Sequence, residues 1–331
     1  MSILQEPILG KHPEEVFISN SEFQTYKRCK RRWYLGTYLG LAPKKALLTG
    51  PLALGTRIHN ALEAYYKDPD VDLMDEYNRL VRIDNRRFLA TPEAAFPENV
   101  DDFDSEAELG RIMVEGYQQW VEETNIDASI EVVGIEEILI HHLKDFDPRV
   151  HVIGKTDLKV LWAFDKTIRL FDHKSAAASG FGDYEKYAYF SEQLMHYTLL
   201  EQLEGDPENK VVGGTYNVLK KVKRSARAKP PFFMRIDVRF NKATMESFKI
   251  RLLGTVRDIM RTRDELDDGA DHRYVAYPTQ KMDWSCGTCP FFSVCNMLDD
   301  GSDAEGMLKD NFVQIDPNAR YNEEDRPEGA E

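Results

Sequence analysis

Two aspartates and one lysine in the middle of the chain have residue types and spacing that suit catalysis. Asp157 lies in the apolar, β-branched run 150–162, and Asp172 and Lys174 follow directly after the next such run, 167–171. A short polar turn signal separates the runs, which predicts a β-hairpin. Asp157 is then expected almost directly across from Asp172, and Lys174 shares the face of Asp172. The hairpin therefore brings two carboxylates and one ammonium together at one end.

This combination suits chemistry on a phosphate. Two facing carboxylates resist ionisation beside each other unless a cation lies between them, and a divalent metal with oxygen ligands provides that cation. The lysine is then placed to hold an attacking water or to stabilise charge that builds on a phosphate. A surface hairpin with a cross-strand ion pair is the alternative, and the spacing alone leaves it open.

Four motifs follow one another along the chain: Gly55-x-x-x-His59 with Leu62-Glu63, Gly154-x-x-Asp157, Asp172-His173-Lys174 and Gln193-x-x-x-Tyr197. In type, spacing and order they resemble the motifs of the PD-(D/E)XK nuclease superfamily, and of its RecB-like branch in particular. The resemblance implies that His59, Asp157, Asp172 and a main-chain carbonyl near His173 hold Mg²⁺ or Mn²⁺. It also implies that Lys174 is catalytic and that Gln193 and Tyr197 lie near the site, where they contact DNA phosphate or the scissile region.

The four cysteines have a metal-binding pattern. Cys286-x-x-Cys289 is followed by Cys295, and Cys29 lies far upstream, inside an expected basic and aromatic helix that begins after Ser19. Disulfides are disfavoured in a reducing cytoplasm, whereas a Cys-x-x-Cys pair grips one metal well, and four thiolates also suit zinc. The pattern resembles the iron–sulfur staple of AddB and of the CRISPR-associated adaptation exonuclease. That resemblance implies a structural [4Fe–4S] cluster that joins the N- and C-terminal segments.

The charge is unevenly distributed. The 331-residue chain has a net charge of −14, and residues 299–331 contribute eleven acidic and three basic residues to it. In contrast, the segment 220–235 holds seven basic residues and no acidic one. A local basic patch matters more than the total charge for a polyanion. We therefore expect DNA contacts from this segment, through Lys220, Lys221, Lys223, Arg224 and Arg227.

The remaining pattern alternates strands and helices. Periodicity predicts helices near 54–67, 71–90, 104–124, 184–203 and 242–266, with Asn241 as the cap of the last. Strands are predicted near 130–142, 150–163, 167–172, 211–219 and 232–240. Glu136 and Glu137 lie on the first strand, where exposed edge-strand glutamates are the ordinary interpretation and an acid that faces the site is the alternative. Residues 1–11 show no secretory signal, and no apolar run is long enough to span a membrane, so we expect a cytoplasmic protein.

These observations lead to one hypothesis for the whole chain. We expect an α/β fold with a PD-(D/E)XK, restriction-endonuclease-like core: a central mixed sheet flanked by helices, in a single domain over 1–297, followed by an acidic, mobile tail over 298–331. The expected activity is that of a divalent-metal-dependent exonuclease on single-stranded or frayed DNA ends. A non-catalytic iron–sulfur module that binds DNA is the alternative. The resemblance also allows a protein partner in recombination or CRISPR adaptation.

Overall fold

The computed structural model describes residues 3–44, 48–278 and 284–321. The chain divides into two compact units, where the sequence analysis expected one domain over 1–297. The first unit comprises Met1–Ala46, Ile140–Gly154 and Glu246–Glu331, and the second comprises Leu47–Leu139 and Lys155–Met245. The division follows from packing, since the two ends of the chain gather in one unit and the middle of the chain forms the other.

A mixed sheet forms the centre of the second unit. Its strands are β3 (Ile130–His142), β4 (Val150–Trp162), β5 (Ile168–Ala177), β6 (Val211–Lys221) and β7 (Phe233–Arg239). β4 pairs with β3 and, antiparallel, with β5; β5 pairs in parallel with β6, which pairs antiparallel with β7. The predicted strand near 167–172 is longer than expected because its pairing with β6 continues to Ala177 and Lys221.

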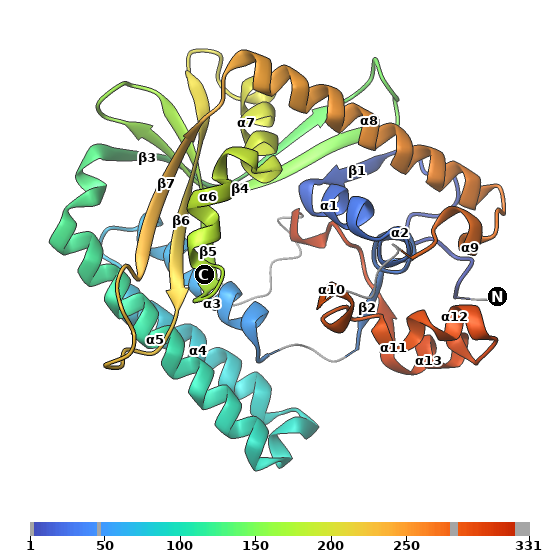
Figure 1. The fold of residues 1–331 in the computed structure, drawn as a ribbon, viewed down its shortest axis with the longest axis horizontal. Helices are drawn as coiled ribbons and strands as arrows, with labels where there is room; N and C mark the ends of the chain where they lie inside the picture. Colours follow the sequence, from blue (N-terminus) through green and yellow to red (C-terminus); the bar gives the residue numbers. More distant parts are fainter. Residues whose placement is uncertain (1–2, 45–47, 279–283, 322–331) are drawn as a thin grey trace. The chain divides into compact units, whose positions relative to one another are not determined.

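Helices cover both faces of this sheet, as expected. Three long helices, α3 (Pro51–Lys67), α4 (Leu73–Leu89) and α5 (Pro97–Thr124), pack together, and their core includes Leu219 and Phe233 from the sheet. α6 (Phe181–Tyr187) and α7 (Glu192–Glu204) contribute Phe181 and Leu194 to a second core with Val218. Figure 1 shows α4 and α5 side by side, with α6 and α7 on the other side of β6. The mixed α/β architecture predicted from the sequence is confirmed.

The predicted helix 184–203 is interrupted. α6 ends at Tyr187, a 3₁₀ turn covers Ala188–Phe190, and α7 begins at Glu192. Ser191 has an extended backbone, and its hydroxyl accepts a hydrogen bond of 3.1 Å from the backbone N–H of Leu194. A serine at this position caps a new helix, so α7 starts afresh there.

The first unit combines the N- and C-terminal segments. β1 (Val16–Ser19) pairs in parallel with the first residues of β4, from Val150 to Ile153. The helices α1 (Asn20–Arg28) and α2 (Lys30–Trp33) pack with α8 (Lys242–Asp267), most of which belongs to this unit. Trp33 is fully buried; its indole N–H donates a 2.9 Å hydrogen bond to Glu22, which also pairs with Arg263 of α8 at 3.3 Å. As predicted, Asn241 caps α8 by accepting a hydrogen bond from the N–H of Thr244.

Residues 298–321, which the sequence analysis expected to belong to a mobile tail, form regular elements of the first unit. These residues complete α12 (Met297–Asp300) and form α13 (Ala304–Asn311), the short strand β8 (Phe312–Gln314) and a final 3₁₀ turn at Ala319–Tyr321. β8 pairs antiparallel with β2 (Leu41–Pro43), and the apolar side chains of Leu308 and Phe312 are buried. Apolar residues among the acidic ones thus anchor this segment. Residues 322–331 lie outside the described residues.

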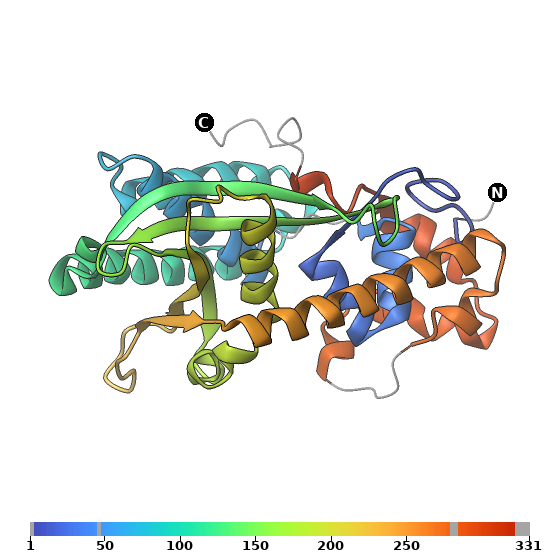
Figure 2. The same cartoon turned by 90° about the horizontal axis from the view of Figure 1, so that it is seen from above.

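Among the described residues, no helix is both long enough and apolar enough to cross a membrane. Figure 2 shows from above how the connection between β6 and β7 extends past the ends of these two strands. That connection, residues 222–232, carries most of the basic segment identified in the sequence.

Candidate active site

The hairpin that carries the two aspartates forms as predicted. β4 and β5 pair antiparallel in a register that runs from Leu161 and Ile168 to Leu158 and Phe171. One further step of this register places Asp157 across from Asp172. The side chain of Asp157 accepts a 2.7 Å hydrogen bond from the backbone N–H of His173, on the opposite strand. The two carboxylates therefore meet at one end of the hairpin.

Asp172 is held from two sides. Its Oδ1 accepts a hydrogen bond of 2.7 Å from the side-chain amide of Gln193, and its Oδ2 lies 2.6 Å from Nζ of Lys174. The residue is only 2% exposed. The pKa of Asp172 is raised to about 6. Burial is the main cause; the attraction of Lys174 offsets it only in part, and the negative charge of Asp157 adds to it. The carboxylate is thus oriented by two neighbours and lies in a poorly solvated place.

Asp157 lies beside a different side chain, the imidazole of His59. Oδ2 of Asp157 lies 3.4 Å from Nδ1 of His59, on α3. Burial acts to raise the pKa of Asp157, but the attraction of His59 and the hydrogen bond from the His173 N–H outweigh it, so the pKa is lowered. Burial correspondingly acts to lower the pKa of His59, and Asp157 raises it above the ordinary value. The helix motif predicted to reach the site therefore does reach it.

Lys174 is a half-buried, charged lysine, with a side chain that is 25% exposed. Burial disfavours its ammonium form, but the nearby carboxylate of Asp172 outweighs burial and raises the pKa of Lys174. Its Nζ also lies 6.0 Å from the centre of the Tyr216 ring, on the neighbouring strand β6. A lysine held in this way keeps its positive charge through the neutral pH range.

His173 contributes its main chain to this place, while its side chain points elsewhere. The imidazole is 2% exposed, stacks on Tyr66 with ring centres 5.8 Å apart, and its Nδ1 lies 2.9 Å from the side-chain amide of Asn217. Burial lowers the pKa of His173 to about 3, so the ring is neutral. Alternation along β5 sends this side chain to the opposite face from Asp172 and Lys174. The ring also meets that of His59 edge to face, with ring centres 6.0 Å apart, while the contact of His173 with Asp157 is made by its main-chain N–H.

Gln193 and Tyr197 of α7 are brought to the site, as predicted. The amide of Gln193 donates to Asp172 and also to the hydroxyl of Tyr197, at 3.0 Å. One turn further along the same helix, Glu201 forms a buried ion pair with Lys159 of β4. Residues spaced by four lie on one helix face, so these three side chains form a polar row against the sheet. Sequence reasoning missed Glu201, although its spacing from Tyr197 was a usable signal.

The two neighbouring glutamates of β3 both face this side of β4. Glu136 pairs with Lys155, and Glu137 lies 3.3 Å from Lys159. Adjacent strand residues normally point to opposite faces, but Glu136 has a left-handed backbone with φ of 52°, which interrupts the alternation. Burial raises the pKa of Glu136, Lys155 opposes the rise and Asp157 adds to it. The alternative that one glutamate faces the site therefore holds for Glu136.

The donor groups fit a divalent metal. Two carboxylates and an imidazole are ligand types that Mg²⁺ and Mn²⁺ accept. Oδ2 of Asp172, although close to the Lys174 ammonium, has no hydrogen bond of good geometry. In the described part of the chain, the donor atoms of His59, Asp157 and Asp172 do not all come within 4.8 Å of one another. Asp172 is instead paired with the ammonium of Lys174, and Asp157 lies beside the imidazole of His59.

The cysteines lie together in the first unit, at half-buried positions. The sequence analysis expected Cys29 inside a helix. It instead has an extended backbone between α1 and α2. α10 (Trp284–Gly287) and α11 (Phe292–Cys295) carry Cys286 and Cys295, and the N–H of Cys289 donates to the carbonyl of Cys286. Burial raises the pKa of Cys289, and the nearby thiols of Cys29 and Cys295 add to the rise.

These thiols do not form a closed site for a single ion. Across the described residues, no three metal-donor atoms within 4.8 Å of one another include a cysteine sulfur. Four thiolates on one zinc ion, at Zn–S distances of about 2.3 Å, would have sulfur atoms only about 3.8 Å apart. Positive charge is present nearby, since Arg31 donates at 4.0 Å to Sγ of Cys295 and at 3.0 Å to its carbonyl.

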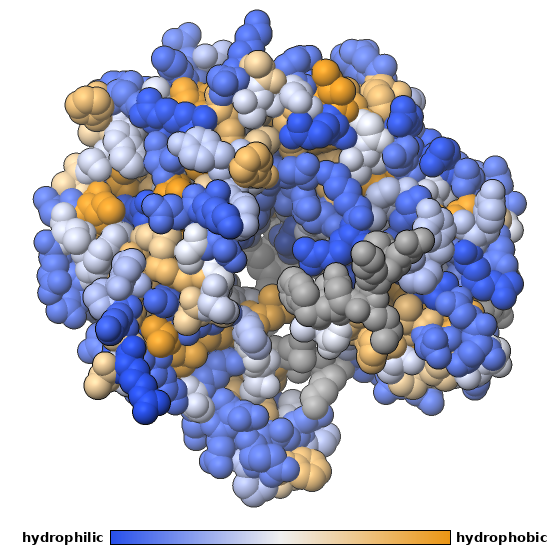
Figure 3. Space-filling model, in the orientation of Figure 1, coloured by the Kyte–Doolittle hydropathy of each residue, from blue (hydrophilic) through white to orange (hydrophobic). Residues whose placement is uncertain are grey.

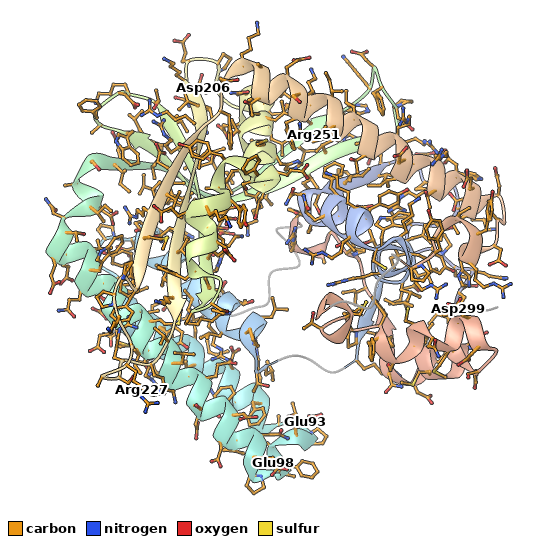
Figure 4. The ribbon with its side chains drawn as sticks, viewed as in Figure 1. Glu93, Glu98, Asp206, Arg227, Arg251 and Asp299 are labelled. Carbon is orange, nitrogen blue, oxygen red and sulfur yellow. The ribbon has the colours of Figure 1, made fainter. Side chains whose placement is uncertain are left out.

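The basic segment forms the end of β6 and the connection to β7. Lys223, Arg224 and Arg227 are exposed, and Lys220 and Lys221 are partly exposed. Figure 4 shows Arg227 at this connection, beside α5, and Nζ of Lys223 donates to the hydroxyl of Ser105 on that helix at 3.0 Å. Arg235, counted in the basic segment, instead points inward: its guanidinium pairs with Asp127 and is 5% exposed. Strand alternation in β7 turns Arg235 toward the core.

Comparison with known proteins agrees with this arrangement. The model of a family described as the PD-(D/E)XK nuclease superfamily matches residues 18–296. No curated protein matches the chain. The matched range contains all four motifs and all four cysteines.

Proposed function

Because the chain belongs to the PD-(D/E)XK nuclease superfamily, we propose that it hydrolyses phosphodiester bonds of DNA with the help of Mg²⁺ or Mn²⁺. We further propose that it acts as an exonuclease on single-stranded or frayed ends. One observation carries the activity: the carboxylate of Asp172 lies opposite Asp157 and 2.6 Å from the ammonium of Lys174. Two carboxylates and a half-buried lysine crowded at one end of a hairpin are costly to desolvate, and they suit the chemistry of a phosphate.

His59, Asp157, Asp172 and a main-chain carbonyl near His173 would hold the metal. When bound, a divalent ion polarises a phosphoryl oxygen and lowers the pKa of a bound water. The protein prepares for this by burying the carboxylate of Asp172 and by orienting it through the amide of Gln193. Tyr197 accepts a hydrogen bond from the same amide and so fixes its orientation.

Lys174 is proposed to act on the water and on the phosphate. Its ammonium remains charged because Asp172 raises its pKa. A permanent positive charge that is already in place stabilises the negative charge that develops when water attacks the phosphorus, without reorganisation at that moment. The same ammonium donates hydrogen bonds, which orient the attacking water.

The basic connection is proposed to track the DNA backbone. Lys220, Lys221, Lys223, Arg224 and Arg227 lie at the end of β6 and in the loop after it, and β6 is the neighbour of the strand that carries Asp172 and Lys174. Positively charged side chains gathered along one segment can follow phosphates without regard to sequence. Arg235 takes no part, because it is an internal residue.

A [4Fe–4S] cluster on Cys29, Cys286, Cys289 and Cys295 is proposed as a structural staple. The four residues come from both ends of the chain and share one compact unit, and the guanidinium of Arg31 lies beside Cys295. Among the described residues no cysteine sulfur belongs to a group of converging donor atoms, so the proposal depends on the cysteine pattern and on the compact unit that the four residues share. Iron analysis and a brown colour test the cluster, because zinc gives no visible colour.

The proposed activity is tested by degradation of DNA. Linear single-stranded DNA labelled at either end, linear duplex and circular single-stranded DNA are incubated with the protein and Mn²⁺, with EDTA as the control. We expect the linear single strand to be shortened from an end and the circle to stay intact. Cleavage of the circle would show an endonuclease instead. Binding without any cleavage would support the non-catalytic module.

A further inference from the structure

A cavity of about 540 Å³ opens immediately beyond Lys174 and is not used by the proposed catalytic groups. It begins at Ser175, the residue after Lys174, and its lining comes from the end of β5, from α6, from the 3₁₀ turn and from Tyr216 of β6. All of these segments belong to the second unit. Its size is within the range of cavities that hold small ligands.

Four of the eleven residues that line this cavity are aromatic. Tyr184 and Tyr216 meet edge to face, with ring centres 5.3 Å apart. Tyr187 and Phe190 also line the cavity, yet they remain 50% and 76% exposed. On the face drawn in Figure 3, apolar side chains are exposed among hydrophilic ones over β6, β7 and α6. Aromatic rings that line a cavity and remain exposed are suited to stack on a flat, partly apolar ligand.

Positive charge borders the cavity on the side of β6. β5 and β6 pair in parallel so that Ala176 lies beside Lys220 and Ala177 beside Lys221, and both alanines line the cavity. The cavity borders the proposed catalytic groups at Lys174, because Nζ of this lysine lies 6.0 Å from the centre of the Tyr216 ring, which lines the cavity. The surroundings thus combine stacking surfaces with sites for phosphate on either side.

We propose that this cavity, the base pocket, binds one unpaired nucleobase next to the phosphate that is cut. Aromatic rings stack on any base, which suits a nuclease without sequence preference, and the carboxylate of Asp183 at the wall accepts hydrogen bonds from base amino groups. A base inside a duplex is already stacked and paired, so only a single strand can supply one cheaply. The base pocket therefore selects single-stranded DNA. This inference rests on the proposed nuclease function, since it takes Lys174 as the place of cleavage.

The test compares three aromatic residues of one short segment. Tyr187→Ala and Phe190→Ala remove lining side chains, whereas Tyr189→Ala removes a ring that is 62% exposed and does not line the cavity. Ala177→Trp fills the base pocket without removing an aromatic ring. Since the substituted side chains are exposed, the variants are expected to melt like the parent. The probe is a single-stranded oligonucleotide with 2-aminopurine near its end, in Ca²⁺, with its length checked on a gel.

We expect stacking to quench the fluorescence of the probe in the parent and in Tyr189→Ala. In Phe190→Ala, Tyr187→Ala and Ala177→Trp, the quench should be lost and binding should weaken roughly tenfold or more, since one stacked base contributes on that order. Binding of blunt duplex should change little in any variant. That pattern supports the base pocket.

Two results would overturn the base pocket. In one, the lining variants quench and bind the probe like the parent; in the other, Tyr189→Ala loses as much as they do. Cleavage of linear DNA by the parent is measured in parallel, so that the two proposals fail separately. If the parent cleaves DNA while the lining variants behave like it, the nuclease function stands and the base pocket is wrong. If the parent neither cleaves nor quenches, both are wrong.

Discussion

The side-chain amide of Gln193 lies 2.7 Å from Oδ1 of Asp172, to which it donates a hydrogen bond. Gln193→Leu removes this donor from a buried carboxylate, and the loss of a hydrogen bond to a charged group costs about 1.5–3 kcal/mol. We expect the cleavage rate to fall roughly 10- to 100-fold while the fold persists. The matched control is Gln202→Leu, on the same helix, whose amide donates to the carbonyl of Val211. Equal cleavage by Gln193→Leu and the parent would contradict the role given to Gln193.

His59 provides a test of metal binding that is separate from cleavage. Its Nδ1 lies 3.4 Å from Asp157, and it is the one imidazole placed among the proposed ligands. His59→Ala should weaken Mn²⁺ binding at least about tenfold, measured by titration calorimetry. His142→Ala is the control, because His142 bonds to the carbonyl of Pro148 instead. Unchanged Mn²⁺ affinity in His59→Ala would remove His59 from the ligand set.

The pair of Lys159 and Glu201 predicts a strong effect on stability. Side chains of both residues are nearly inaccessible, at 10% and 0% exposed. Glu201→Leu leaves a buried lysine without this partner, and breaking a buried pair costs about 3–5 kcal/mol. The double variant Lys159→Met with Glu201→Leu should recover much of this loss, because no buried charge remains. Urea unfolding of both variants measures it, and similar stability of the single and the double variant would contradict the expectation.

Asp147 predicts a dependence of stability on pH. Its pKa is lowered. The hydrogen bonds from Arg149 are the largest cause, and burial opposes them only in part. An acid with a lowered pKa in the folded state contributes stability above its unfolded pKa of about 3.9, and that contribution is lost as the pH falls through the folded value. Asp147→Asn should therefore cost about 1 kcal/mol at pH 7 and less at pH 3. Urea unfolding at the two pH values measures it; an equal cost at both would contradict it.

The cysteines predict an effect on the whole first unit. Cys29→Ala should lose the iron, the brown colour and several degrees of melting temperature, since a bound metal group contributes to folding free energy. Cys29 is remote in sequence from the other three, so its loss releases the N-terminal segment from the C-terminal one. Full iron content and an unchanged melting temperature in Cys29→Ala would show that the four-cysteine cluster is wrong.

Much of the site was predictable because its signals are local. The hairpin follows from two β-branched runs and a polar turn, and its register then fixes Asp157 opposite Asp172. The row of Gln193 and Tyr197 follows from helical spacing. The left-handed backbone at Glu136 was not predictable, because Glu136 is a non-glycine residue within a strand pattern. Its partner, Lys155, lies on the neighbouring strand and cannot be identified from the local sequence.

Errors of the sequence reasoning arose where long-range packing decides. The acidic tail contains too few apolar residues for a periodic signal, yet the three-residue strand β8 finds a partner in β2 at the other end of the chain. Arg235 looked like part of a DNA-binding segment because charge was counted along the chain, whereas it pairs internally with Asp127. The division into two units follows from the meeting of the two ends, which no local pattern reports.

The central claim is that the hairpin with Asp157, Asp172 and Lys174 cuts DNA. The most direct measurement is the rate of degradation of end-labelled linear single-stranded DNA in Mn²⁺ by Lys174→Ala, beside the control Lys166→Ala. Lys166 is an exposed lysine at the turn of the same hairpin. We predict that Lys174→Ala loses cleavage by at least about 100-fold while it still binds Mn²⁺, and that Lys166→Ala cleaves like the parent. Cleavage by Lys174→Ala at the parental rate would contradict the account.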